Sequence, residues 1–375
     1  MSKKRLQKAV IFSLISLFLL AFSYQESFCM IEEDEERHTV VSRAFPHLPD
    51  EIGVHIFCFL DQFDLLKRTV LVSKSWRKAT ENVWKFIPLH LKGNKIGVEG
   101  TKAIANGNLS NLIMLNLSRN NIGVEGVKNL ASGNLLNLTM LDLSHNKIGV
   151  EGAKTIATGN LSNLITLGLR WNNIGVEGAK TIATGNLLNL ITLGLNNNNI
   201  GVEGAKTIAN GNLSNLITLY LSYNHIGDDG AKAIANGNLS TNLITLNLNS
   251  NNIRVEGAKT LANGNLSNLI TLHLWNNNIG EEGAKAIATG NLSNLITLGL
   301  NNNNIGADGA KSIANGCLLN LTELHLNGNN IGDNGAKNIA NGYLSNLTTL
   351  NLYNNNIEAE GEAVLKQRFG SKVKF

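Results

Sequence analysis

Hydrophobic and polar positions follow one pattern from residue 89 onward, and this pattern recurs about every 26 residues. The copy that starts at Leu164 reads Leu-Ile-Thr-Leu-Gly-Leu-Arg-Trp-Asn-Asn-Ile. The Leu-x-Leu step has a period of two, which predicts a short strand with both leucines facing a core, while segments such as 179–183 have helical spacing. The final isoleucine occurs in eleven copies, at positions 96, 122, 148, 174, 200, 226, 253, 279, 305, 331 and 357. The pattern therefore predicts eleven strand–helix units, with one additional residue at Ser240-Thr241.

An asparagine follows the strand in all eleven copies, from Asn94 to Asn355. At this point the chain must turn inside the stack of repeats, and an amide side chain can both donate to and accept from backbone groups that would otherwise be buried without partners. We therefore interpret the asparagine column as structural and not as a ligand-binding feature.

Glycine and lysine recur on the helical side of each unit. A glycine from Gly100 to Gly361 stands just ahead of the helical segment, and a second glycine lies in its C-cap region. Lysine occupies one helix position in ten copies, and in nine of them an acid precedes it by three residues, as Glu99 precedes Lys102. Such i,i+3 pairs favour a solvated, self-neutralised face over a basic stripe.

The recurring Leu-x-x-Leu-x-Leu-x-x-Asn-x-Ile resembles the leucine-rich-repeat consensus. The Gly-x-Glu-Gly-Ala-Lys that follows makes the unit similar to the ribonuclease-inhibitor type, although 26 residues is short for that type. The resemblance implies an α/β solenoid over residues 88–375, with a parallel concave sheet and short convex helices. A final helix at 360–369 is expected to act as the C-terminal cap.

Residues 44–87 lack the repeat and have a helical pattern. Pro49 suits a first helical turn, and Ile52, Ile56 and Leu60 fall on one face of the helix that follows. Other apolar residues occupy the opposite face, and a unit of this size has little core with which to cover both. The segment therefore needs an outside surface to pack against.

This helical segment resembles an F-box in the order and spacing of its short runs: Leu48-Pro49-Asp50-Glu51-Ile52, Ile56-Phe57-Cys58-Phe59-Leu60, Asp64-Leu65-Leu66, Val72-Ser73-Lys74 and Trp76-Arg77. The resemblance implies docking on the Skp linker of a cullin-based SCF ubiquitin ligase. The residues that it places in the contact are Leu48, Pro49, Ile52, Ile56 and Leu60. The alternative is that these residues form the core of a three-helix cap on the solenoid.

Residues 1–23 read as a secretory signal peptide, followed by an acidic linker at 24–43. Basic residues precede an uncharged apolar segment at 9–22, with small residues at Ala21 and Ser23. The segment is shorter than the roughly 20 apolar residues of a membrane span. An uncleaved anchor reaching from Val10 to Cys29 is the alternative.

The formal charge of +4 comes from 32 Lys and Arg against 28 Asp and Glu. Four of the basic residues lie in the predicted signal peptide, so its removal leaves 28 of each sign. This balance argues against nucleic acid and anionic membrane as partners. The three cysteines, Cys29, Cys58 and Cys317, are too few and too far apart for a disulfide framework or a zinc site. No phosphate-binding loop, His-x-x-x-His or Cys-x-x-Cys occurs, so we expect no cofactor, no metal and no enzymatic activity.

Target binding is expected on the concave sheet, at strand positions that do not point inward. Most of these positions hold Thr, Asn or Gly. Exposed Trp, Tyr and Arg are typical of binding hot spots, and drift at unconstrained positions is the alternative explanation. The larger residues that form the candidate surface are Arg170, Trp171, Tyr220, Tyr223, His273 and Trp275, followed by His325 and Tyr353.

These features favour a substrate-recruiting adaptor of an SCF-type ubiquitin ligase, a monomer within its complex, that binds Skp linker, cullin and a target protein. The signal peptide conflicts with the cytosolic site of that machinery. A bacterial effector that is exported and then acts in a host cytoplasm would reconcile the two. The alternative is an exported leucine-rich-repeat binding or adhesion module, extracellular or membrane-anchored, without a ubiquitin role.

Overall fold

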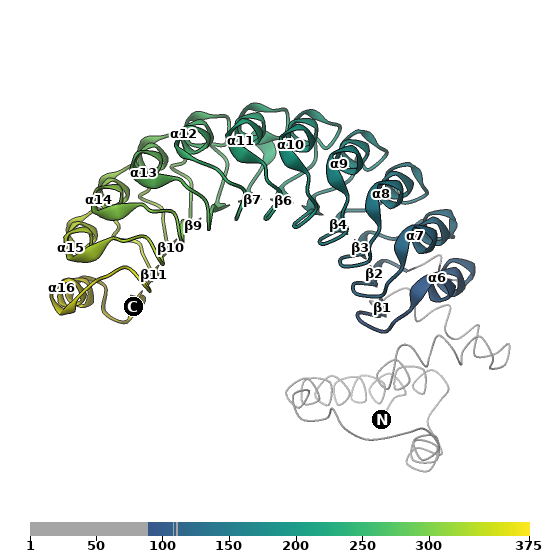
Figure 1. Ribbon diagram of the computed structural model, residues 1–375, viewed down its shortest axis with the longest axis horizontal. Coiled ribbons are helices and arrows are strands. Elements are labelled where there is room, and N and C mark those ends of the chain that lie inside the picture. The colour runs from purple at the N-terminus through teal and green to yellow at the C-terminus, as the bar shows by residue number, and fades with distance from the viewer. Residues whose placement is uncertain (1–88, 108, 110–111) are drawn as a thin grey trace, which may run out of the picture. The chain divides into compact units, whose positions relative to one another are not determined.

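The computed structural model describes residues 89–107, 109 and 112–375. The predicted signal peptide, acidic linker and F-box-like segment, including Leu48, Pro49, Ile52, Ile56 and Leu60, lie outside the described residues. Within the described part, short strands line the inner side of an arc and helices line its outer side (Figure 1). Strand and helix alternate along the chain, as the repeat pattern predicts.

The strands form one parallel sheet of 12 strands that follow one another in chain order. Equivalent residues of neighbouring repeats pair in register, as Leu167 pairs with Leu193. The strands are β1 (Leu89–His90), β2 (Met114–Asn116), β3 (Met140–Asp142), β4 (Thr166–Gly168), β5 (Thr192–Gly194), β6 (Thr218–Tyr220), β7 (Thr245–Asn247), β8 (Thr271–His273), β9 (Thr297–Gly299), β10 (Glu323–His325), β11 (Thr349–Asn351) and β12 (Val373–Lys374).

One helix per repeat covers the convex side. The helices are α6 (Gly97–Asn106), α7 (Gly123–Ser132), α8 (Gly149–Thr158), α9 (Gly175–Thr184), α10 (Gly201–Asn210), α11 (Gly227–Asn236), α12 (Val255–Asn263), α13 (Gly280–Thr289), α14 (Gly306–Asn315), α15 (Gly332–Asn341) and α16 (Ala359–Phe369). Each helix begins earlier than its pattern indicates, so Gly178 lies inside the first turn of α9 and not ahead of it. Glycine is required at this helical position because Cγ2 of Ile174 fills the space that a Cβ on Gly178 would take.

The core consists of the residues that the repeat pattern places inside. Leu167 and Leu169 from the strand, Ile174 from the turn, and Ala179 and Ile182 from the helix are all fully buried. Each repeat packs on its neighbours, so the core continues from turn to turn.

The asparagine column forms a ladder of hydrogen bonds between consecutive repeats. Nδ2 of Asn172 donates to the carbonyl oxygens of Leu143 at 2.9 Å and Leu169 at 3.0 Å. Its Oδ1 accepts from the backbone nitrogen of Asn146 at 2.8 Å. The ladder repeats with buried asparagines at 120, 146, 172, 198, 224, 251, 277, 303, 329 and 355. The structural interpretation of this column is confirmed.

Ion pairs on the helices also follow the predicted spacing in part. The described residues include i,i+3 pairs at Lys128–Glu125 (2.7 Å), Lys206–Glu203 (2.7 Å) and Lys259–Glu256 (2.8 Å). All three are exposed, so each adds little to stability.

The additional residue of the longer repeat is taken up by a short 3₁₀ helix, η1 (Ser240–Asn242). Oγ of the buried Ser240 donates to the carbonyl oxygen of Gly237 at 2.7 Å. The flanking strands β6 and β7 keep their register.

The predicted C-terminal helix is α16, whose Leu365 and Phe369 are buried. After it, η2 (Gly370–Lys372) leads into β12, which pairs with β11 through Val373 and Leu350. The sequence did not indicate this last strand, because a two-residue strand carries no periodic signal.

Among the helices of the described residues, none has the length and apolar character that crossing a bilayer requires.

Candidate functional site

Beyond the residue that starts each strand, such as Thr166, each repeat presents side chains toward the concave side at three positions. In the repeat that contains β4, they belong to Gly168 at the end of the strand, Arg170 two residues later and Trp171 in the following turn. We call these the strand, exit and turn positions. The turn position has a left-handed backbone, with φ of 58° at Trp171.

The six sequence-predicted residues occupy all three positions. Tyr220 and His273 are strand residues, Arg170 and Trp275 are exit residues, and Trp171 and Tyr223 are turn residues. Several are well exposed: Trp171 by 48%, Tyr223 by 53% and Trp275 by 36%. Ring contacts place Trp171 in one cluster and His273 and Trp275 in another.

The first cluster contains His273, Trp275 and His325, and we call it the histidine cluster. The Trp275 ring lies edge-on to both imidazoles, with centroid separations of 5.6 Å to His273 and 6.0 Å to His325. Gly299 occupies the strand position of the repeat between the two histidines, and a Cβ there would collide with Nε1 of Trp275. Because Gly299 has no side chain, the indole of Trp275 can occupy the space above it.

Burial lowers the pKa of His273, and the neighbouring His325 acts in the same direction against the opposing effect of Glu323. Burial also lowers the pKa of His325, while Glu323 again acts to raise it. Burial therefore favours the neutral form of both imidazoles.

The histidine cluster also contains buried polar atoms with unused hydrogen-bonding capacity. Nδ1 of His325 lies 2.6 Å from the side-chain amide of Asn351, and which of the two groups donates depends on the histidine tautomer. Three other buried atoms in the described residues have no hydrogen-bond partner: Nδ1 of His273, Oδ1 of Asn327 and Oδ1 of Asn351.

The second cluster lies in the first repeats and consists of Lys92, Arg119, His145, Arg170 and Trp171; we call it the basic cluster. The rings of His145 and Trp171 stack with centroids 5.5 Å apart and an interplanar angle of 15°. The backbone nitrogen of His145 also donates to the carbonyl oxygen of Arg170 at 2.7 Å.

Arg119 and His145 are not among the concave residues predicted from the sequence. Arg119, His145 and Trp171 occupy the turn position of three successive repeats, so aligning the repeats position by position would have found them. Tyr220 and Tyr223 come between the two clusters in the chain, and no ring contact within the described part joins them to either.

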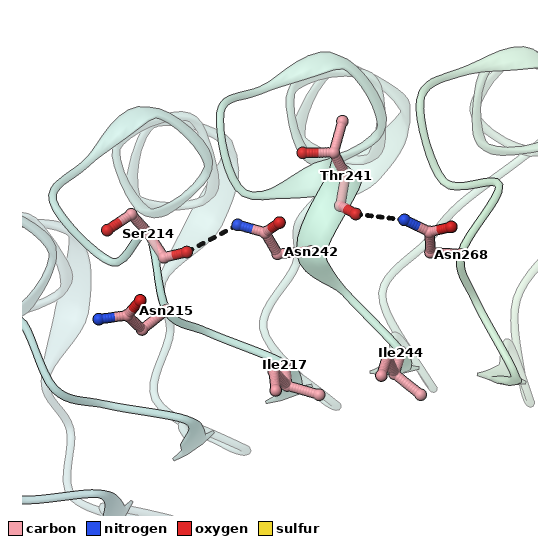
Figure 2. A pocket seen from close by; sticks show the side chains of 7 residues that line it. All are labelled: Ser214, Asn215, Ile217, Thr241, Asn242, Ile244 and Asn268. Atoms are coloured by element: carbon pink, nitrogen blue, oxygen red, sulfur yellow. Dashed lines mark hydrogen bonds between the residues drawn. The ribbon is translucent and has the colours of Figure 1, made fainter.

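Two shallow hollows lie along a different edge, where the chain enters the strands. Figure 2 shows one of them, with Ile217 and Ile244 at the starts of their strands. The amides of Asn242 and Asn268 each donate at 2.7 Å to a carbonyl oxygen of the preceding repeat, from Ser214 and Thr241. These amides already hold neighbouring repeats together by hydrogen bonds, and no titratable side chain lines either hollow. This edge therefore offers less specific chemistry to a ligand than the concave clusters do.

Over residues 89–107, 109 and 112–375, no group of three or more His, Cys, Asp or Glu side chains is arranged to hold a metal ion.

Two families match the chain. Residues 45–89 match the F-box-like family. More than half of the chain matches the leucine-rich-repeat family, in eleven segments: 89–105, 108–131, 134–157, 160–183, 186–209, 212–235, 239–262, 265–288, 291–314, 318–340 and 343–361. The chain belongs to the leucine-rich-repeat family. An F-box-like domain followed by leucine-rich repeats is the arrangement of a protein-interaction adaptor, and both are typically non-catalytic binding modules.

A solved internalin structure shows the same fold for the leucine-rich repeats. An internalin of Listeria monocytogenes is 24% identical, with a TM-score of 0.52 over 83% of this chain and 94% of the internalin. The PEPR1–AtPEP1 structure is 20% identical, with a TM-score of 0.42 over 71% of this chain and 35% of that one. No curated protein matches the chain.

Proposed function

We propose that this leucine-rich-repeat protein is the substrate-recruiting adaptor of an SCF-type cullin ubiquitin ligase. The observation that carries the proposal is the F-box-like match directly ahead of the repeats, whose concave side displays exposed tryptophans. In this role, the F-box-like residues Leu48, Pro49, Ile52, Ile56 and Leu60 contact the Skp linker. The concave clusters hold the target protein.

The adaptor acts by proximity and performs no bond-making step itself. Holding a target beside the ubiquitin-conjugating enzyme raises the effective concentration of the target's lysines there. A solenoid suits this task, because its in-register sheet and continuous core support many side chains on one curved surface.

We further propose that the signal peptide directs export of the protein and that the protein then acts in a host cytoplasm. The charge pattern of residues 1–23 supports this route. Fractionating the native cell and sequencing the N-terminus of the exported protein would test it. A mature protein that begins after Ser23 supports export, whereas an intact N-terminus in the membrane fraction indicates an anchor.

The ligase role is tested by expressing residues 24–375 in eukaryotic cells and measuring whether Skp linker and cullin co-purify. We expect both to be retained, and both to be lost when Leu48→Ala is combined with Pro49→Ala. A matched control combines Trp171→Asn with Trp275→Asn on the concave side and should retain both subunits. If the unmodified protein retains neither, the ligase role is wrong and an exported binding module remains.

A further inference from the structure

At the strand, exit and turn positions, the charged residues of the repeats gather at one end, whereas Glu323 at the start of β10 and Lys374 of β12 lie at the other end of the sheet. At the strand, exit and turn positions, all charged residues in the described repeats lie in the first four: Lys92, Arg119 and Arg170, with Asp142 as the single acid. The equivalent positions of the later repeats hold no Lys, Arg, Asp or Glu. The near-neutral balance of the whole chain therefore conceals a locally cationic surface.

These cations act on the same place, the stacked pair of His145 and Trp171. Burial is the largest cause that lowers the pKa of His145, followed by Arg119 and then Arg170. Lys92 adds a smaller effect in the same direction, whereas Asp142 opposes them. Three positive charges thus lie close enough to one imidazole to disfavour its protonation.

Asp142, the single acid at these positions, already accepts a hydrogen bond within the protein. Oδ1 of Asp142 accepts a hydrogen bond from the backbone nitrogen of Ser144 at 2.9 Å. The arginine side chains form no ion pair in the described structure, and Arg119 and Arg170 are both exposed. The basic cluster therefore offers two guanidinium groups to a partner.

Backbone conformation distinguishes this cluster from drift at a surface position. Arg119, His145 and Trp171 have φ of 59°, 58° and 58°, in the left-handed region that disfavours bulky side chains. Most other repeats hold residues that tolerate this region better, such as Asn197 and Gly328, and Tyr223 is the one other aromatic residue at this position in the described repeats. Three successive bulky residues at strained positions favour a role in binding.

We propose that the basic cluster binds an acidic segment of the target protein. Carboxylates of the segment pair with the guanidinium groups of Arg119 and Arg170, a geometry that allows bidentate hydrogen bonds. An apolar side chain of the same segment packs on the exposed part of Trp171. The inference rests on the proposed role of the concave side in target binding, and it adds the chemistry of the partner.

A protein segment fits this surface better than a nucleic acid does. Binding to nucleic acid through phosphates depends on the summed contacts of many Lys and Arg side chains, and a strongly salt-dependent duplex binder makes about 6–10 of them. The basic cluster has three lysine and arginine residues, and the only other cation at these positions in the described sheet is Lys374, on the last strand, far along the sheet from the cluster.

The test measures binding of the full-length chain to fluorescein-labelled octaglutamate, with octaglutamine and a single-stranded DNA octamer as comparison probes. We expect octaglutamate to bind, octaglutamine not to bind, and the DNA octamer to bind more weakly than octaglutamate. Combining Arg119→Gln with Arg170→Gln should weaken octaglutamate binding about tenfold or more, because two charge-assisted contacts are lost. The matched control combines Arg254→Gln with Arg368→Gln, two exposed arginines elsewhere, and should leave the affinity unchanged.

Two further measurements separate binding from a folding defect. Trp171→Asn introduces the residue that other repeats hold at the turn position, so it should preserve the fold while weakening octaglutamate binding. Nuclear magnetic resonance titration should show the pKa of His145 rising when octaglutamate is bound, because added carboxylates favour the imidazolium.

The proposal is wrong if octaglutamate does not bind, if the control pair weakens binding as much as the cluster pair, or if the DNA octamer binds more tightly. The same protein preparation is also tested for binding to the Skp linker. This measurement distinguishes failure of the acidic-segment inference from failure of the proposed ligase role. Skp capture without octaglutamate binding overturns only the acidic-segment inference. Octaglutamate binding without Skp capture overturns only the ligase role.

Discussion

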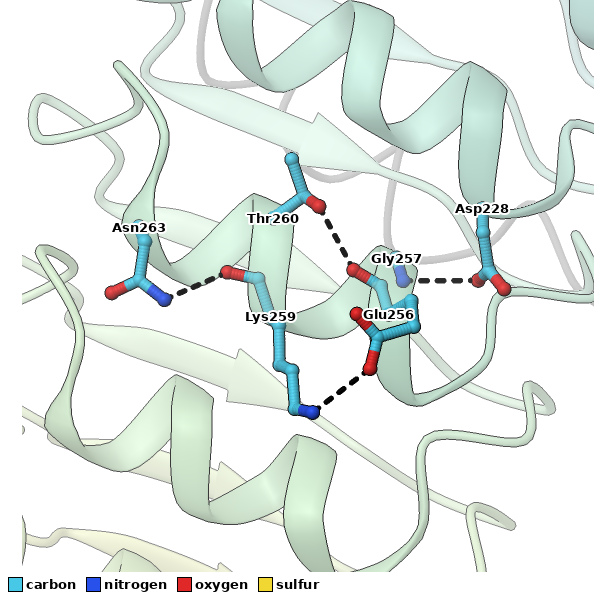
Figure 3. Close-up of polar contacts among 6 residues, drawn as sticks. All are labelled: Asp228, Glu256, Gly257, Lys259, Thr260 and Asn263. Carbon is cyan, nitrogen blue, oxygen red and sulfur yellow. Dashed lines mark hydrogen bonds and ion pairs between the residues drawn. The ribbon is translucent and has the colours of Figure 1, made fainter.

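Asp228 caps the helix of the repeat that follows it through the backbone of Arg254. Its Oδ1 accepts from the nitrogen of Arg254 at 2.7 Å and from that of Gly257 at 3.1 Å; Figure 3 shows the second bond. In nine other repeats a glycine with φ between 57° and 66° stands where Arg254 stands, and its nitrogen donates to the next repeat, as Gly175 donates to Asn198.

A side chain at this position disfavours the left-handed conformation, and Arg254 has φ of −111°. Its N–H group therefore bonds to the preceding repeat, where an aspartate replaces the valine found in earlier copies. The same exchange occurs at the last helix, where Oδ1 of Asp333 accepts from the nitrogens of Glu358 at 2.8 Å and Gly361 at 3.2 Å. Each aspartate compensates for a glycine that its successor repeat has lost.

This relationship predicts that Asp228→Val destabilises the protein by about 1–2 kcal/mol, because two N–H groups at a helix start lose their acceptor. The same substitution should cost much less in an Arg254→Gly background, where the regular glycine geometry returns. Urea unfolding of the four proteins of this double-mutant cycle measures the coupling. Equal costs in both backgrounds would show that the two residues act independently.

The asparagine ladder predicts a large difference between buried and exposed asparagines. Asn198→Ala removes donors to Leu169 and Leu195 and an acceptor for Asn172, all inside the stack, and should cost about 2–4 kcal/mol. Asn189→Ala removes one exposed bond to Ser162 and should cost less than about 1 kcal/mol. Denaturant unfolding of the two variants compares them directly, and similar losses would contradict the structural role of the ladder.

The glycine that ends each helix is predicted to be required for close packing. A Cβ on Gly211 would collide with the backbone oxygen of Ala183 in the preceding repeat, so Gly211→Ala should cost about 1–3 kcal/mol. On the concave side, Gly194 has its nearest neighbours 3.8 Å from an added Cβ. Gly194→Ala should therefore be neutral or slightly stabilising, since it restricts the unfolded chain. Thermal unfolding of both variants checks the contrast, which fails if Gly211→Ala is tolerated.

Stability should decrease as the pH falls below about 6.5, the ordinary pKa of an unfolded histidine. Burial lowers the folded-state pKa of His273 and His325, so the unfolded chain binds protons first and acid favours unfolding. The effect develops between the unfolded pKa and the lower folded values. Free energies of unfolding at pH 7.5 and pH 5 should differ less in a His273→Gln, His325→Gln variant. The exposed His225→Gln control should keep the full difference, and a double variant with unchanged pH dependence would disprove the assignment.

Much of the fold could be predicted because each repeat carries a complete local signal. Leu167 and Leu169 are two residues apart and both buried, as a strand with one inward face requires. Asn172 was interpreted as structural from its place at the strand exit, and its hydrogen bonds confirm that. Gly211 was also expected to end a helix, but its φ of −78° shows that the reason is contact with the neighbouring repeat and not a left-handed cap.

The candidate site was only partly predictable. Trp275 could be identified as an exposed aromatic residue, yet its contacts with His273 and His325 join three repeats and depend on the empty space above Gly299. His145 could not be identified as a site residue from the sequence, since one histidine among scattered others has no local signature.

The sequence by itself determined the repeat unit, its inward leucines, its asparagine ladder and the F-box-like segment, because those depend on residues close together in the chain. Only the tertiary structure decided which outward side chains become neighbours. Parallel in-register strands bring residues about 26 positions apart side by side, so Arg119, His145 and Trp171 form one surface. The charges of that surface could not be inferred from the chain's overall balance, because net charge does not record where in space each charge lies.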